Sequence, residues 1–94
     1  MIQNKMSTIR TFQISSDLFW GYRISIDISY FDNVQEIIDY VKSDIRTFLL
    51  SKNLQCLVEK LEASKFHIHQ PYDVLQDLKN YTTNNDIIYI CDHC

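Results

Sequence analysis

Residues 33–50 read NVQEIIDYVKSDIRTFLL, and the rest of the fold can be argued from this segment. Its apolar side chains recur at steps of three and four residues, which lines them along one face of an α-helix. Asn33 is a good N-cap residue, and Glu36 stands three residues later, as in a capping box. The residues of the apolar face are Val34, Ile37, Ile38, Val41, Ile45, Phe48 and Leu49. Such a face requires a second layer to pack against.

Two segments before this helix alternate between apolar and polar residues, as strands with one buried face do. Residues 8–15, TIRTFQIS, place Phe12 and Ile14 in the apolar row. Gly21, the only glycine, favours a turn with a positive φ between the two strands. The apolar row of the second segment, GYRISIDISY, consists of Tyr22, Ile24, Ile26, Ile28 and Tyr30. We therefore expect an antiparallel hairpin that packs on the helix.

Four more segments complete the predicted order of elements. NLQCLVEKLEAS is a second helix, either separate from the first or continuing it through a kink, and Cys56 within it is expected to be buried. KFHIHQPY is a short strand with Phe66 and Ile68 inward. YDVLQDLKNY forms a helical turn or two, followed by the polar loop TTNND. DIIYICDHC is the last strand, with Ile88 and Ile90 inward.

Length and composition predict one small globular domain. We expect residues 1–7 to be a flexible N-terminus and residues 8–94 to form the domain. The hydrophobic share of 46% and the charged share of 22% are ordinary for a globular protein. Neither a secretory signal nor an apolar run of about 20 residues is present, so a soluble, cytoplasmic chain without a membrane partner is expected.

The net charge and the amino-acid composition indicate which class of partner and which kind of source organism to expect. A net charge of −3 with nine scattered Lys and Arg residues argues against nucleic acid as the partner. Frequent Ile, Asn, Asp, Lys and Tyr with one Gly and one Pro are typical of AT-rich genomes, such as those of some protists and giant DNA viruses. A viral chain would act in the host cytoplasm.

The order strand, strand, long helix, strand, short helix, strand resembles the ubiquitin-like β-grasp fold over residues 8–94. The resemblance implies an α+β fold in which a mixed four-stranded sheet packs on one long helix. The helical region 34–63 is longer than usual for the family, which implies an added second helix. Conjugated members end in Gly-Gly, whereas this chain ends in CDHC, so covalent attachment is not expected. The main rival, a ferredoxin-like sandwich, needs a helix between the first two strands, and SSDLFWG is too short for one.

The resemblance also implies where the candidate binding residues lie. The last strand would occupy the sheet centre, parallel to the first strand and antiparallel to the strand at Phe66. His67 and His69 would then share the exposed sheet face with Tyr89, Cys91 and His93. In ubiquitin-like domains this face commonly binds partners, and an amphipathic patch with aromatic residues suits protein contact. We therefore expect a protein–protein interaction module, whose strand after Phe66 also presents a sheet edge.

A zinc site is the alternative function. His67 and His69 alternate along one strand, and Cys91 and Cys94 form a Cys-x-x-Cys pair, which together supply four zinc ligands. Cys91 and Cys94 are three residues apart, so they face opposite ways in an extended strand and the tail would have to curl. Because the chain has three cysteines and no secretion signal, reduced thiols are expected. If the protein is an interaction module and not a zinc-binding protein, no cofactor is expected.

Catalysis is not expected. Cys91 beside His67 or His69, with Asp92 to orient an imidazole, would resemble a thiol nucleophile and its base. However, no Gly-rich turn supplies an oxyanion hole, and a flat sheet face holds substrate poorly. Trp20, next to the hairpin turn, is either a lid over one end of the core or an exposed contact residue.

Overall fold

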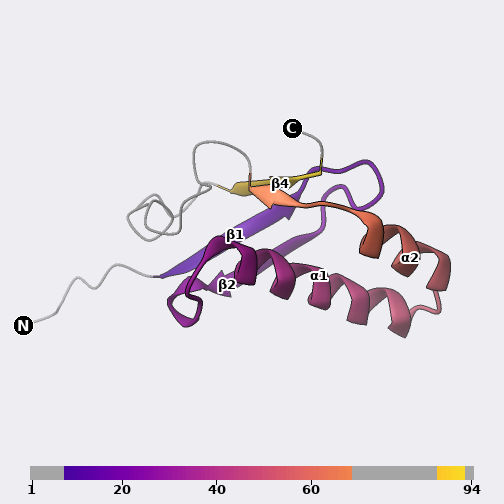
Figure 1. The fold of residues 1–94 in the computed structure, drawn as a ribbon, viewed down its shortest axis with the longest axis horizontal. Helices are drawn as coiled ribbons and strands as arrows, with labels where there is room; N and C mark the ends of the chain where they lie inside the picture. The colour runs from indigo at the N-terminus through magenta and orange to yellow at the C-terminus, as the bar shows by residue number, and fades with distance from the viewer. Residues whose placement is uncertain (1–7, 69–86, 93–94) are drawn as a thin grey trace, which may run out of the picture.

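The structure is a computed structural model, and it describes residues 8–68 and 87–92. These residues form an α+β fold in which a mixed four-stranded sheet packs against two helices (Figure 1). The elements are β1 (Ile9–Ile14), β2 (Arg23–Asp27), the 3-10 turn η1 (Ile28–Tyr30), α1 (Val34–Ser51), α2 (Gln55–Ala63), β3 (His67–Ile68) and β4 (Ile88–Cys91). The prediction of a mixed sheet on a long helix with an added second helix is confirmed at this level.

The sheet has the strand order β2-β1-β4-β3. β1 pairs antiparallel with β2 and parallel with β4, and β3 pairs antiparallel with β4. The last strand therefore lies between the first strand and the strand at Phe66, as predicted. β3 is an edge strand, as expected, and two of its residues are described, whereas the other edge strand, β2, has five.

The core lies between one face of the sheet and α1. The inward row of the sheet alternates as the sequence predicts, because Phe12, Ile88 and Ile90 are almost fully buried. The helix contributes its apolar face to the same cluster. Its buried residues are Ile37, Ile38, Val41, Ile45 and Leu49.

The start of α1 follows the predicted cap with one change. Asn33 Oδ1 accepts a hydrogen bond of 2.9 Å from the backbone N–H of Glu36, which satisfies one unpaired donor of the first turn. The Glu36 carboxylate reaches back to the backbone N–H of Asp32, at 2.8 Å. The usual capping box closes on the cap residue itself. Here it closes one residue earlier.

The turn between the helices reverses the chain. Asn53 has a φ of 58°, in the left-handed region that Asn tolerates better than most residues. The backbone N–H groups of Leu54 and Asn53 donate to the carbonyls of Leu49 and Leu50, at 2.9 and 3.1 Å. This pair of bonds is the Schellman motif, which ends a helix sharply. A kinked continuation of α1 was therefore the wrong alternative.

α2 returns alongside α1, as Figure 1 shows. Lys42 Nζ donates to the Ser64 carbonyl at 2.8 Å, and Arg46 forms an ion pair with Glu62. The reversal also leaves Cys56 exposed and free, because only Val58 and Leu61 of α2 are buried. The prediction that Cys56 is buried was wrong.

The second strand ends earlier than its alternation predicts. The Asp27 side chain accepts hydrogen bonds from the Thr8 hydroxyl and from the backbone N–H of Ser29, at 2.6 and 3.1 Å. These bonds hold the pKa of Asp27 below its usual value. The chain turns into η1, and Tyr30 is 83% exposed instead of joining the buried row.

Some predictions fall outside the described residues. The N-terminal residues 1–7, the helical turn YDVLQDLKNY and the loop TTNND belong to this group. His69, His93 and Cys94 belong to it as well.

Candidate functional site

The predicted site lies on the face of the sheet that points away from α1. We call this surface the open face and define it by residues on neighbouring strands: Ile9, Thr11, Gln13, Arg23, Ser25, Asp27, His67, Tyr89 and Cys91. Tyr89 pairs in register with Gln13, and Gln13 pairs with Arg23, so these three form one row across the sheet. His67 pairs with Cys91 at the β3 edge. The structure thus places His67, Tyr89 and Cys91 on one face, as predicted.

The centre of the open face is polar and bonded across the strands. Arg23 donates to Gln13 Oε1 through Nη2 at 2.8 Å and through Nε at 3.2 Å. The hydroxyls of Thr11 and Ser25 lie 3.0 Å apart. Tyr89 stands beside this network and is 43% exposed. The surface therefore combines a half-exposed aromatic ring with polar groups held in place.

The His67 end of the open face is more buried than the sequence predicts. Cys91 is disulfide-bonded and 6% exposed, so the prediction of a reduced thiol there was wrong. Nε2 of His67 is buried without a hydrogen-bond partner. A buried ring nitrogen left unpaired costs about 1–3 kcal/mol. The His67 end is therefore a buried edge of the open face, and Tyr89 is the exposed residue of the predicted site.

The disulfide affects two possible roles of Cys91, as a zinc ligand and as a thiol nucleophile. A zinc ligand and a thiol nucleophile both require Cys91 as a thiolate. The sulfur would reach that state only after reduction of its disulfide. Among residues 8–68 and 87–92, no three His, Cys, Asp or Glu side chains cluster in a way that could hold a metal ion. His69 and Cys94, the other predicted ligands, lie outside the described residues.

A second surface was not predicted as a site. It is an apolar groove between the loop that joins β1 to β2 and the turn that joins α1 to α2. We call it the Trp20 groove. Its principal side chains are Leu18, Trp20, Tyr22, Phe48, Leu54 and Leu57.

Backbone hydrogen bonds hold Trp20 in the groove wall. The N–H of Gly21, which has a φ of 86°, donates to the Ile14 carbonyl at 2.9 Å. The N–H of Tyr22 donates to the Phe19 carbonyl at 3.1 Å. Phe19 turns into the core, whereas Trp20 is 72% exposed. Trp20 is therefore exposed and does not form a lid over one end of the core.

Tyr22 joins the loop to α1 at the base of the groove. Its hydroxyl donates to an oxygen of Asp44, and its ring meets that of Phe48 edge-on, with centroids 5.9 Å apart. Partial burial raises the pKa of Tyr22 to about 12, and the Asp44 carboxylate adds to the rise because it opposes a phenolate. The wall of the groove is thus fixed to the helix at neutral pH.

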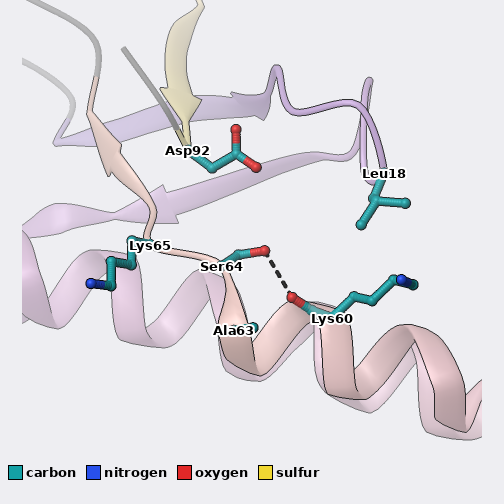
Figure 2. Close-up of a pocket in the computed structure, with 6 residues that line it drawn as sticks. All are labelled: Leu18, Lys60, Ala63, Ser64, Lys65 and Asp92. Atoms are coloured by element: carbon teal, nitrogen blue, oxygen red, sulfur yellow. Dashed lines mark hydrogen bonds between the residues drawn. The ribbon is translucent and has the colours of Figure 1, made fainter.

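Leu18 also borders a neighbouring pocket, drawn in Figure 2. Lys60, Ser64, Lys65 and Asp92 line it, and the Ser64 hydroxyl donates to the Lys60 carbonyl at 2.9 Å. Figure 2 shows Leu18 pointing toward α2, with Lys60 extending on the same side and Lys65 on the other. The groove and this pocket thus share Leu18, and the pocket contains two lysines and one aspartate.

The groove escaped prediction because its residues come from three separate segments of the chain. The apolar pattern of each segment predicts buried core residues, and Trp20 alone was considered as an exposed contact residue. Within the described residues, neither helix has both the length and the apolar composition needed to cross a bilayer. Comparisons with protein-family models, with curated proteins and with solved structures find no match to this chain.

Proposed function

We propose that this protein is a non-catalytic interaction module that binds a partner protein through the open face of its sheet. The observation that carries the proposal is the row Tyr89, Gln13 and Arg23, in which a 43% exposed tyrosine stands beside side chains fixed by hydrogen bonds. Tyrosine is enriched among the residues that dominate binding energy at protein interfaces. Fixed polar neighbours lower the entropy lost on binding.

We further propose that the fold is of the ubiquitin-like β-grasp type. The strand order and the parallel pairing of β1 with β4 support it, as does the position of α1 across one face. The resemblance implies partner binding on the sheet face opposite the helix. That face is the open face.

The proposed location is the cytoplasm, where the partner would also be found. Disulfides are rare in that compartment because glutathione and thioredoxin keep thiols reduced. The proposal therefore implies that the Cys91 disulfide is opened in the cell. Counting free thiols in protein trapped with an alkylating agent at lysis tests this, and a persistent disulfide would favour an oxidising compartment.

The proposed function is tested by affinity capture with matched tyrosine variants. The tagged protein and its Tyr89→Ala and Tyr30→Ala variants are incubated with an extract of the organism that encodes them. Tyr30 is the control because it is an exposed tyrosine on η1 and is not one of the open-face residues. We expect a protein that the wild type and Tyr30→Ala retain and that Tyr89→Ala loses, with unchanged thermal midpoints. Equal retention by all three would contradict binding through the open face.

His67→Ala is expected to weaken capture less than Tyr89→Ala, since Nε2 of His67 is already buried. Loss of capture in His67→Ala with full capture in Tyr89→Ala would move the contact to the β3 edge.

A further inference from the structure

The Trp20 groove is a second surface whose composition is unusual for exposed protein. Trp20 is 72% exposed, and Leu18, Phe48 and Leu54 are also exposed beside it. Contiguous exposed apolar side chains mark interaction sites more often than single ones do. The groove lies at the loop end of the hairpin and does not include the residues of the open face.

Two lysines border the groove. Lys52 Nζ lies 5.9 Å from the centroid of the Phe48 ring, and Lys60 lines the adjoining pocket beside Leu18. Within the part of the chain that the structure describes, neither ammonium group has an acid partner, since Arg46–Glu62 is the one ion pair found there. Both positive charges are therefore available to a ligand.

Two carboxylates on elements next to the groove are already engaged. Asp44 accepts the Tyr22 hydroxyl, and Asp92 has an interaction of its own. Lys52 and Lys60 thus place positive charge beside the groove, although Asp17 stands next to Leu18 and the whole chain carries −3. Such a surface is complementary to a segment that combines large apolar side chains with carboxylates.

We propose that the Trp20 groove binds a short acidic peptide segment of a partner protein. The segment places apolar side chains between Trp20 and Phe48 and sets carboxylates near Lys52 and Lys60. An apolar floor with charged ends is how grooves recognise amphipathic segments.

Two other occupants fit the groove less well. A second copy that pairs through a two-fold axis would place the same groove against itself, so the lysines of both copies would lie in one interface. An anionic membrane would attract Lys52 and Lys60 through the same charges, but it would meet them as a flat surface. The concave shape of the groove also suits inserted side chains better than a flat lipid surface.

Trp20 is the only tryptophan of the chain, so its fluorescence reports directly on the groove. The probes are three synthetic 12-residue peptides with identical Leu and Phe positions and with Glu, Gln or Lys at the remaining positions. We expect the Glu peptide to shift Trp20 emission to the blue and to protect it from iodide, with weaker effects of the Gln peptide and none of the Lys peptide. Binding should weaken as salt is raised, because exposed ion pairs are screened.

Charge reversal gives the sharpest variant. Lys52→Glu with Lys60→Glu should exchange the preference, so that the Lys peptide binds and the Glu peptide does not. Arg23→Glu is the control on the open face and should leave the peptide preference unchanged. By isothermal calorimetry, Phe48→Ala should weaken binding of the Glu peptide by about 10-fold or more, as loss of a buried aromatic contact does.

Several results would overturn the proposal. Equal binding of the three peptides would remove the charge argument, and peptide binding without a change in Trp20 emission would place the contact elsewhere. A blue shift that rises with protein concentration alone would mean self-association. A blue shift caused by phosphatidylglycerol vesicles and by none of the peptides would mean a membrane surface. Because the readout is Trp20, its failure leaves the open face untouched, and the Tyr89 capture experiment tests that face separately.

Discussion

On the open face of the sheet, polar side chains bond to one another across the strands. In the Trp20 groove, by contrast, large apolar side chains face water, and Lys52 and Lys60 lack an acid partner among the described residues. Arg23 and Gln13 represent the first surface, in which most hydrogen-bonding capacity is already used. The open face therefore presents polar groups in a fixed arrangement, whereas the groove presents apolar surface that a ligand could remove from water.

The two surfaces also depend on different local structure. The open face needs only the register of the strands, which the inner core sets. The groove needs the reversal at Asn53 and the contact between Tyr22 and Asp44. Substitutions at these points should therefore affect one surface without the other.

The largest expected effect is at the turn between the helices. Asn53→Val should lower the free energy of unfolding by about 2 kcal/mol, because a β-branched residue resists a left-handed φ. Asn53→Gly is the matched control and should be neutral or slightly stabilising. Urea unfolding measures both. Equal stability of the two variants would mean that the helices do not depend on this turn.

A smaller effect is expected at the base of the groove. Tyr22→Phe keeps the ring contact with Phe48 but removes the hydrogen bond to Asp44, so a loss of about 1.5 kcal/mol is expected at pH 7. The folded pKa of about 12 lies above the ordinary value of 10.0, so folding favours the neutral phenol. This contribution is complete below pH 10 and is lost as the pH rises through 12.

The measurement is the difference in unfolding free energy between wild type and Tyr22→Phe, followed from pH 8 to pH 12. The other tyrosines titrate in both proteins and cancel. A difference that stays constant over this range would show that Tyr22 is not held as a neutral donor.

On the open face, Arg23→Ala should cost about 1 kcal/mol, because it leaves the Gln13 side-chain carbonyl without its donor. The double variant with Gln13→Ala should cost less than the sum of the single variants, since the two residues form one contact. Chemical unfolding of the four proteins completes the cycle. Strict additivity would mean that the pair contributes nothing to the stability of the face.

The smallest effect is expected for the exposed aromatic residues themselves. Trp20→Ala and Tyr89→Ala should each change the free energy of unfolding by less than about 0.5 kcal/mol, as surface substitutions usually do. Differential scanning calorimetry checks this. A large loss in Trp20→Ala would mean that Trp20 closes the core, which was the other sequence-based reading.

Much of the fold could be predicted because burial imposes a period on each segment. The alternation around Phe12 and the three-and-four spacing of α1 both identify inward faces. The strand order was predicted from the resemblance to the β-grasp fold, because the pattern of one segment does not show which strand it pairs with. The end of β2 was not predicted correctly. The Asp27 side chain accepts hydrogen bonds from Thr8 and Ser29, and such local bonds compete with the pairing of strands.

The candidate site could be predicted only in part. Register placed Tyr89 and His67 on one face, but burial at Cys91 depends on tertiary contacts that no local pattern encodes. The Trp20 groove could not be predicted, because Phe48 and Leu54 belong to apolar faces that the sequence assigns to the core. Both side chains are exposed in the structure, and only Asn53, two residues after the end of α1, signals the reversal of the chain.

The most direct test of binding through the open face is amide chemical-shift mapping of the labelled protein with the partner that it captures. The largest shifts are expected at Thr11, Arg23, Ser25 and Tyr89, with little change at Gln35, Asp39 and Ser43 on the exposed side of α1. Shifts confined to that side of α1, with none on the sheet, would contradict the proposed function.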